Sequence, residues 1–139
     1  MNYSAIVQNG GGRHQVTLRT GETGHSIDIP PKPSGFGSRL NGGEALSLAL
    51  ATCYCNDIYR EAARRGIQVE SVEIEVDGDF AAEGEPARSI SYRAKVVAQA
   101  GQEEIRDLMK HTDTVAEIQN TVRAGMPVTL KEIEAVSRK

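Results

Sequence analysis

The chain has 139 residues and a formal net charge of −3, and only 4% of its residues are aromatic. This length is enough for one domain with its own core, so we expect a single domain over residues 1–139. A negative net charge does not favour binding to nucleic acid or to anionic membranes, both of which need a basic surface. The few aromatic side chains also disfavour the stacking that single-stranded nucleic acid requires. We therefore predict no nucleic-acid partner and no membrane partner.

The N-terminal residues lack the basic start and apolar core of a signal peptide. The longest apolar run, residues 45–55, is too short to cross a bilayer. Two cysteines one residue apart do not form a disulfide framework. Together these features predict a cytoplasmic protein whose thiols are reduced at rest.

The first third of the chain has the alternating pattern of strands with one buried face. Three strands are expected, at residues 3–8, 13–19 and 25–29, and glycine-rich turns separate them. Residues 30–43 contain three prolines and four glycines, which predicts a loop.

A helix is predicted over residues 43–65, with Asn41 as its cap and Gly66 as its left-handed end. Residues 45–55 are apolar on nearly all sides, which indicates burial on all sides, as at the centre of a dimer. From Asn56 onward the helix carries five charged residues that we interpret as a solvated face: Asp57, Arg60, Glu61, Arg64 and Arg65.

Residues 69–80 and 89–97 alternate between apolar and charged side chains and predict an antiparallel hairpin. Its outer face would set acidic residues of the first strand against basic residues of the second. Two helices, at 101–110 and 113–124, and a closing strand at 126–136 complete the prediction. The expected fold class is α+β.

Cys53 and Cys55 are the only cysteines, and both fall within the predicted long helix. Successive helical residues turn by about 100°, so the two thiols point in different directions. They cannot form an unstrained disulfide there or converge on one metal ion, and the three histidines are isolated in the sequence and expected at the surface. We predict no metal site and no cofactor. Each cysteine is then either a small core residue or, if a cation lowers its pKa, a nucleophile.

The order of elements resembles that of the OsmC/Ohr family (osmotically inducible protein C and organic hydroperoxide resistance protein). "GGEALSLALATC", residues 42–53, is similar to the start of that family's central helix, and the spacing from Cys53 to Gly66 fits the same pattern. "TVRAGMPVTL", residues 121–130, resembles its C-terminal end. The resemblance implies an OsmC-like fold, with antiparallel sheets wrapped around a long central helix in an intertwined homodimer.

The same resemblance implies a function and a set of residues. Peroxidase members reduce organic hydroperoxides with a helix cysteine, here Cys53, whose pKa is lowered by an arginine that a glutamate holds. Arg39 and Arg13 are the candidate arginines, and Glu44 is the candidate glutamate, although Glu44 also suits the first turn of a helix. The family's resolving cysteine corresponds to Ala116, so an external thiol reductant would be needed.

Two functions remain open from the sequence. One is a thiol-dependent peroxidase that acts on an organic hydroperoxide through Cys53. The other is a non-enzymatic paralogue, a dimeric structural protein or a binder of an apolar small molecule. Retention of Cys53 favours the first function, and the absence of a thiol at Ala116 favours the second.

Overall fold

A computed structural model describes all residues 1–139. Its internal contacts divide the chain into two compact units, Met1–Leu48 and Ala49–Lys139. The single domain expected over the whole chain stays a prediction.

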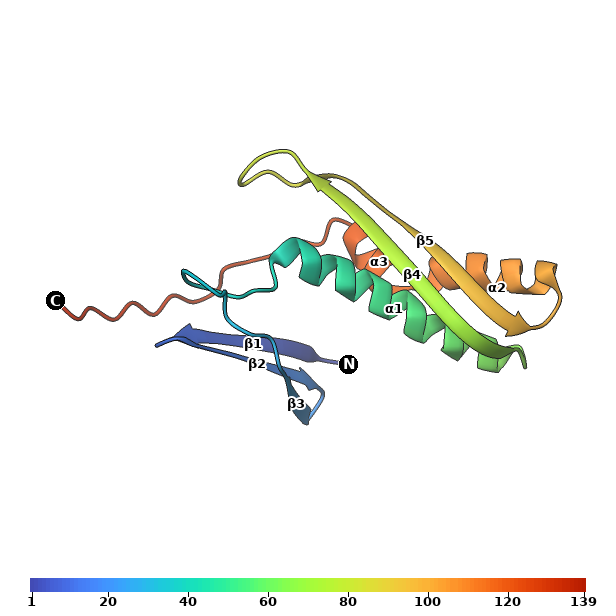
Figure 1. Cartoon of the computed structure of the whole chain (residues 1–139), viewed down its shortest axis with the longest axis horizontal. Helices are drawn as coiled ribbons and strands as arrows, with labels where there is room; N and C mark the ends of the chain where they lie inside the picture. The colour runs from blue at the N-terminus through green and yellow to red at the C-terminus, as the bar shows by residue number, and fades with distance from the viewer. The chain divides into compact units, whose positions relative to one another are not determined.

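The first unit contains a three-stranded antiparallel sheet in the order β1-β2-β3 (Figure 1). Its strands are β1 (Tyr3–Gly10), β2 (Arg13–Thr20) and β3 (Thr23–Ile27). The three predicted strands are confirmed, with β3 placed two residues earlier than expected. Val16 is the only buried residue of the sheet, so this unit has almost no core of its own.

The predicted loop after the sheet is also confirmed. It contains a single isolated bridge between Pro31 and Ser38 and gives way to a helix at Gly42, so the loop ends two residues earlier than predicted. The backbone N–H of Arg39 donates to the carbonyl of Pro30 at 3.0 Å and closes the loop ahead of the helix.

Helix α1 (Gly42–Arg64) starts in a reciprocal cap. Asn41 Oδ1 accepts the backbone N–H of Glu44 at 2.8 Å, and Glu44 Oε1 accepts the backbone N–H of Asn41 at 3.0 Å. This capping box satisfies two backbone donors that a helix start leaves free. The helix ends at Gly66, whose φ of 67° lies in the left-handed region, as predicted.

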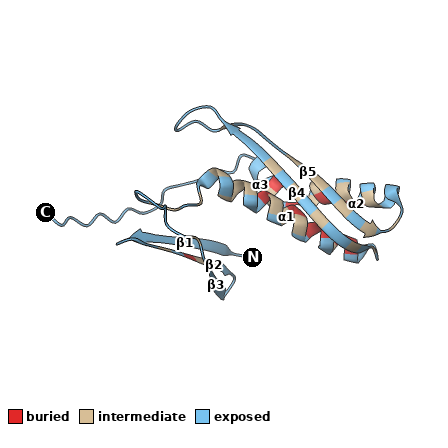
Figure 2. Cartoon of the chain, in the orientation of Figure 1, coloured by how far each residue is buried: buried red, intermediate tan, exposed pale blue.

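The solvated face expected on the charged half of α1 is wrong for two of its residues, while the burial of the apolar half was expected in a dimer and stays a prediction. Leu48 in the apolar half is 56% exposed, whereas Asp57 and Glu61 in the charged half are only 6% and 4% exposed. Figure 2 shows the buried residues of α1 concentrated beneath the hairpin. The carboxylates of Asp57 and Glu61 are buried because ion pairs satisfy them, whereas Arg64 and Arg65 are exposed, as expected.

The sheet of the second unit is an antiparallel hairpin of two strands, β4 (Gln68–Phe80) and β5 (Ala87–Gln99). The predicted alternation is confirmed on β4, where apolar side chains are half-buried and acidic ones exposed. Arg93 on β5 contacts Glu75 at 2.7 Å and Asp77 at 3.2 Å across the outer face. The expected pairing of acidic and basic strands is therefore present.

Helices α2 (Gln102–Val115) and α3 (Glu117–Arg123) follow the hairpin. The predicted break near residues 111–112 is wrong, because α2 continues to Val115 and the chain bends at Ala116, whose backbone is extended. Helices α1 and α2 pack on the hairpin around one cluster. Its buried members are Tyr54, Ile58, Ala62 and Leu108.

The closing strand predicted at 126–136 is absent. Residues after Gly125 form no helix or strand, and Val128 is 99% exposed. A strand needs a neighbouring strand for its backbone hydrogen bonds, and no strand of the chain pairs with this segment. None of the helices has the length and apolar character required to cross a membrane.

The hairpin register can be tested with Ile74, which packs against the core cluster, and its neighbour Glu73, which is exposed. Ile74→Asp should lower the free energy of unfolding by about 2 kcal/mol or more, because it places a carboxylate against apolar side chains. The matched Glu73→Gln variant should change it by less than about 0.5 kcal/mol. Urea denaturation at one protein concentration measures the free energy of unfolding of both variants. A larger loss of stability in Glu73→Gln than in Ile74→Asp would contradict this register.

Candidate functional site

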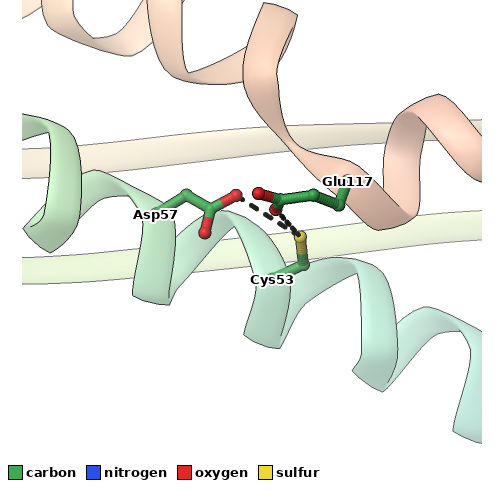
Figure 3. Close-up of side chains that lie close together, drawn as sticks. All are labelled: Cys53, Asp57 and Glu117. Atoms are coloured by element: carbon green, nitrogen blue, oxygen red, sulfur yellow. Dashed lines mark hydrogen bonds between the residues drawn. The ribbon is translucent and has the colours of Figure 1, made fainter. Parts of the chain in front are cut away.

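Cys53 lies on α1 where the start of α3 approaches it. Its Sγ is 3.5 Å from Oδ2 of Asp57, one helical turn further along α1, and 3.8 Å from Oε2 of Glu117 on α3. Figure 3 shows the three side chains pointing toward one another. The thiol therefore has two carboxylates as proton acceptors.

Arg60 connects the two carboxylates that flank Cys53. Its Nη1 is 3.1 Å from Oδ1 of Asp57 and 2.9 Å from Oε1 of Glu117. Nη2 of Arg60 also donates to the carbonyl of Val115 at 3.5 Å. Arg60 thus attaches the second half of α1 to the junction between α2 and α3.

Glu61 is the second buried carboxylate of α1 and has three basic partners. Its oxygens lie 2.9 Å from Nε of Arg60, 2.9 Å from Nη1 of Arg64 and 2.9 Å from Nε2 of His111. His111 was expected to be an ordinary surface residue, and this contact corrects that expectation. Glu61 therefore ties α2 to the same polar network.

Burial is the largest influence on the pKa of Asp57 and raises it. A hydrogen bond with the Glu117 carboxylate raises the pKa of Asp57 further, while the charge of Arg60 opposes both effects. The pKa of Glu117 is lowered, first by a backbone N–H donor and then by its bonds to Arg60 and Asp57. Of the two carboxyl groups, Asp57 therefore takes up a proton more readily than Glu117.

The pKa of the Cys53 thiol is raised from its ordinary value of 9.0, mainly by burial. The backbone N–H of Ile118 opposes this by hydrogen bonding to the sulfur, whereas Asp57 and Glu117 raise the pKa further. The arginines that the resemblance implied belong to the first unit, so a lowering of this pKa by either of them stays a prediction. Within the second unit, the surroundings of Cys53 favour the neutral thiol.

The other predicted site residues belong to the first unit. Glu44 is engaged in the capping box with Asn41. Arg13, the first residue of β2, and Arg39, in the loop before α1, are both exposed. Their relation to Cys53 stays a prediction.

Cys55 lies apart from the Cys53 cluster, in a shallow pocket of about 270 Å³ between α1 and β4. Both cysteines are free thiols, as the helical spacing predicted. The pocket walls are small or aliphatic side chains, together with one amide: Ala51, Thr52, Asn56, Val72 and Ile74. No charged group lines this pocket.

The sequence interpretation missed the carboxylates and the arginine that surround Cys53. Asp57 and Arg60 follow Cys53 by four and seven residues, a spacing that puts all three on one face of a helix. This spacing could have predicted that Asp57 and Arg60 lie near Cys53. Glu117, 64 residues away, had no such local signal.

The donor atoms of Cys53, Asp57 and Glu117 lie within 4.8 Å of one another, a closeness that the sequence did not reveal. The guanidinium of Arg60 already contacts both carboxylates. We assign no metal to the cluster, because this arginine supplies the positive charge that an ion would bring.

Residues 35–131 match the model of the family described as OsmC-like protein. Because this match spans most of the chain, the protein belongs to the OsmC family. No curated protein matches the sequence.

Solved structures of the same family share the fold. An OsmC-like protein from Mycoplasma pneumoniae is similar with a TM-score of 0.63 and 19% identity, over 88% of each chain. An OsmC-like protein of unknown function from Vibrio cholerae has a TM-score of 0.60 and 18% identity, over 87% of this chain and 93% of that one. An organic hydroperoxide resistance protein OsmC from Legionella pneumophila has a TM-score of 0.57 and 19% identity, over 86% and 89%. The predicted OsmC-like α+β fold is confirmed.

The Glu61 contacts predict a specific dependence of stability on pH. Hydrogen bonds from Arg60 and then His111 lower the pKa of Glu61 below its ordinary value of 4.5. A carboxyl whose pKa is depressed by folding stabilises the protein above its unfolded pKa, and this contribution disappears as pH falls through the folded pKa. Glu61→Gln should therefore destabilise the protein at pH 7, and its deficit relative to wild type should shrink at acid pH.

Urea denaturation at a series of pH values from neutrality to below 4.5 measures this deficit. Glu103→Gln, which changes an exposed carboxylate of α2, is the matched control and should show almost no deficit at any pH. A Glu61→Gln deficit that stays constant or grows on acidification would contradict the assigned contacts.

Proposed function

We propose that the protein is a thiol-dependent peroxidase that reduces organic hydroperoxides through Cys53. The observation that carries this proposal is the position of Cys53, half-exposed on α1 of an OsmC-like domain, with two carboxylates as proton acceptors at its sulfur. Similar proteins named as organic hydroperoxide resistance proteins come from Legionella pneumophila and Elizabethkingia anophelis. A cytoplasmic location would suit a reaction that depends on reduced thiols.

The reductant in this proposal is an external thiol. Ala116, the position implied for a resolving cysteine, is fully buried and directly precedes Glu117, which contacts Cys53. A thiol there would be near the reactive sulfur, but alanine cannot supply one. Cys55 lies in a separate pocket. The sulfenic acid formed at Cys53 would therefore be reduced by a small thiol or dithiol from solution.

A non-enzymatic function is the second candidate, and two observations favour it. The raised pKa of Cys53 disfavours the thiolate. A separate open pocket of about 430 Å³ is lined by the aromatic side chains of Tyr54 and Tyr92. Two charged residues, Lys110 and Asp113, also line it. Such a combination of apolar walls and a few charges suits a small-molecule ligand.

Chemical trapping decides between these functions. The reduced protein should form one sulfenic acid per chain when mixed with an organic hydroperoxide, and dimedone should label Cys53 but not Cys55. Cys53→Ser should abolish labelling, and the matched Cys55→Ser variant should retain it. Mass spectrometry locates the adduct. If Cys53 of the wild-type protein reacts no faster than free cysteine, the peroxidase function is contradicted and the non-enzymatic function is favoured. Arg13→Ala and Arg39→Ala in the same assay test the two arginines, since loss of the one that activates Cys53 should slow its reaction.

The proposal includes a homodimer. Helix α1 leaves Leu48 exposed, every residue of β1 is exposed, and the C-terminal segment exposes apolar residues such as Val128 and Leu130. A protein that leaves so many large apolar side chains in water is stabilised by covering them. A second copy of the chain presents the same unpartnered faces.

Sedimentation at low micromolar concentration should give about twice the chain mass of 15.0 kDa. The melting temperature should rise with protein concentration, because dissociation and unfolding are then coupled. Val128→Asp is expected to weaken the assembly, whereas Lys131→Asp changes a charge in the same segment and serves as its control. A stable monomer with a melting temperature independent of concentration would rule out the dimer.

A further inference from the structure

A pair of carboxyl groups and a guanidinium lie close to Cys53. The carboxyl groups, those of Asp57 and Glu117, are within 3.8 Å of its sulfur. The guanidinium, that of Arg60, contacts both carboxyl groups from the side of α1. A thiol that must lose a proton thus lies beside groups that can accept one, and those groups are held in place by a fixed cation.

We propose that Asp57 and Glu117 form a proton relay, which accepts the proton of the Cys53 thiol and delivers it to the alkoxide that leaves the hydroperoxide. This inference rests on the proposed peroxidase function and names two further catalytic residues for it. Arg60 is the positioning residue, because it contacts both carboxyl groups of the relay and is not bonded to the sulfur.

The chemical step balances within these groups. The thiol proton passes to the carboxylate pair, and the sulfur attacks the terminal oxygen of the hydroperoxide. The S–O bond forms as the O–O bond breaks, and the pair returns the proton to the departing alkoxide. The sum is Cys53–SH + ROOH → Cys53–SOH + ROH, in which sulfur loses two electrons and the peroxide gains them. The backbone amide of Ile118, which lowers the pKa of the thiol, favours negative charge on the sulfur during the transfer.

The positive charge of Arg60 lies against both carboxyl groups of the pair. Asp57 is buried close to Glu117, and burial together with that neighbouring carboxylate raises the pKa of Asp57 and makes it a better proton acceptor. The charged and titratable groups nearby come from three helices. They are Arg60, Glu61 and Arg64 of α1, His111 of α2 and Glu117 of α3. Arg64 and His111 contact Glu61 and not the relay.

Two reactions of Cys53 separate a relay from a purely electrostatic effect. Alkylation by iodoacetamide needs only the thiolate, because iodide leaves without a proton. Reduction of a hydroperoxide needs the thiolate and also a proton donor for the alkoxide. The ratio of the two second-order rate constants, peroxide over iodoacetamide, therefore measures proton delivery independently of how much thiolate is present.

The experiment uses the full chain in a Cys55→Ser background, with cumene hydroperoxide as the peroxide. Asp57→Asn removes a negative charge from the neighbourhood of the thiol, so alkylation at pH 7 should become several-fold faster. The same change removes a proton carrier, so the rate ratio should fall by about tenfold or more. Asp107→Asn, at an exposed carboxylate of α2, should leave both rates unchanged.

Glu117→Gln keeps the test decisive if loss of the buried Asp57 carboxylate prevents folding. The Glu117 side chain is 63% exposed, so its amide variant should fold, and it should lower the ratio in the same direction. A folded variant whose ratio stays at the parent value overturns the relay, as does a parallel rise of both rates. A parent protein that is alkylated at Cys53 but does not reduce the hydroperoxide is the separate failure of the proposed function, and the relay falls with it.

Discussion

The burial of acidic side chains on α1 is the constraint on which the second unit depends. Asp57 and Glu61 face inward on the same helix that supplies the apolar core, and a buried carboxylate without a partner would destabilise the fold by several kcal/mol, on the order of 3–5. Arg60 meets this requirement by contacting both of them and Glu117. The same contacts that satisfy these charges attach α1 to the start of α3 and set the surroundings of Cys53.

Much of the architecture followed from local patterns. The alternation on β4 and β5 predicted both the hairpin and its charge pairing, and Asn41 predicted the start of α1, because strand faces and helix caps are decided by residues close in sequence. The burial of Asp57 was not predicted, since charged residues are usually solvated and its partner Glu117 is distant in the sequence. The strand predicted after Gly125 was wrong for a related reason: an alternating pattern indicates a strand only where a neighbouring strand exists.

The candidate site shows the same division. Cys53 was located by its place in a family pattern, and Asp57 and Arg60 were accessible from helical spacing alone. Glu117 required the bend at Ala116, which ends α2 and brings the carboxylate of the next residue to the sulfur. Burial, and then the carboxylates of Asp57 and Glu117, raise the pKa of Cys53, so its reactivity depends on where the proton goes.

The central claim is that burial, together with Asp57 and Glu117, holds Cys53 as a thiol at rest. The most direct measurement is the pH dependence of iodoacetamide alkylation at Cys53 in the Cys55→Ser protein. The account predicts a midpoint above the ordinary thiol value of 9.0. A midpoint below that value would mean that a cation governs the thiol, and it would contradict the account.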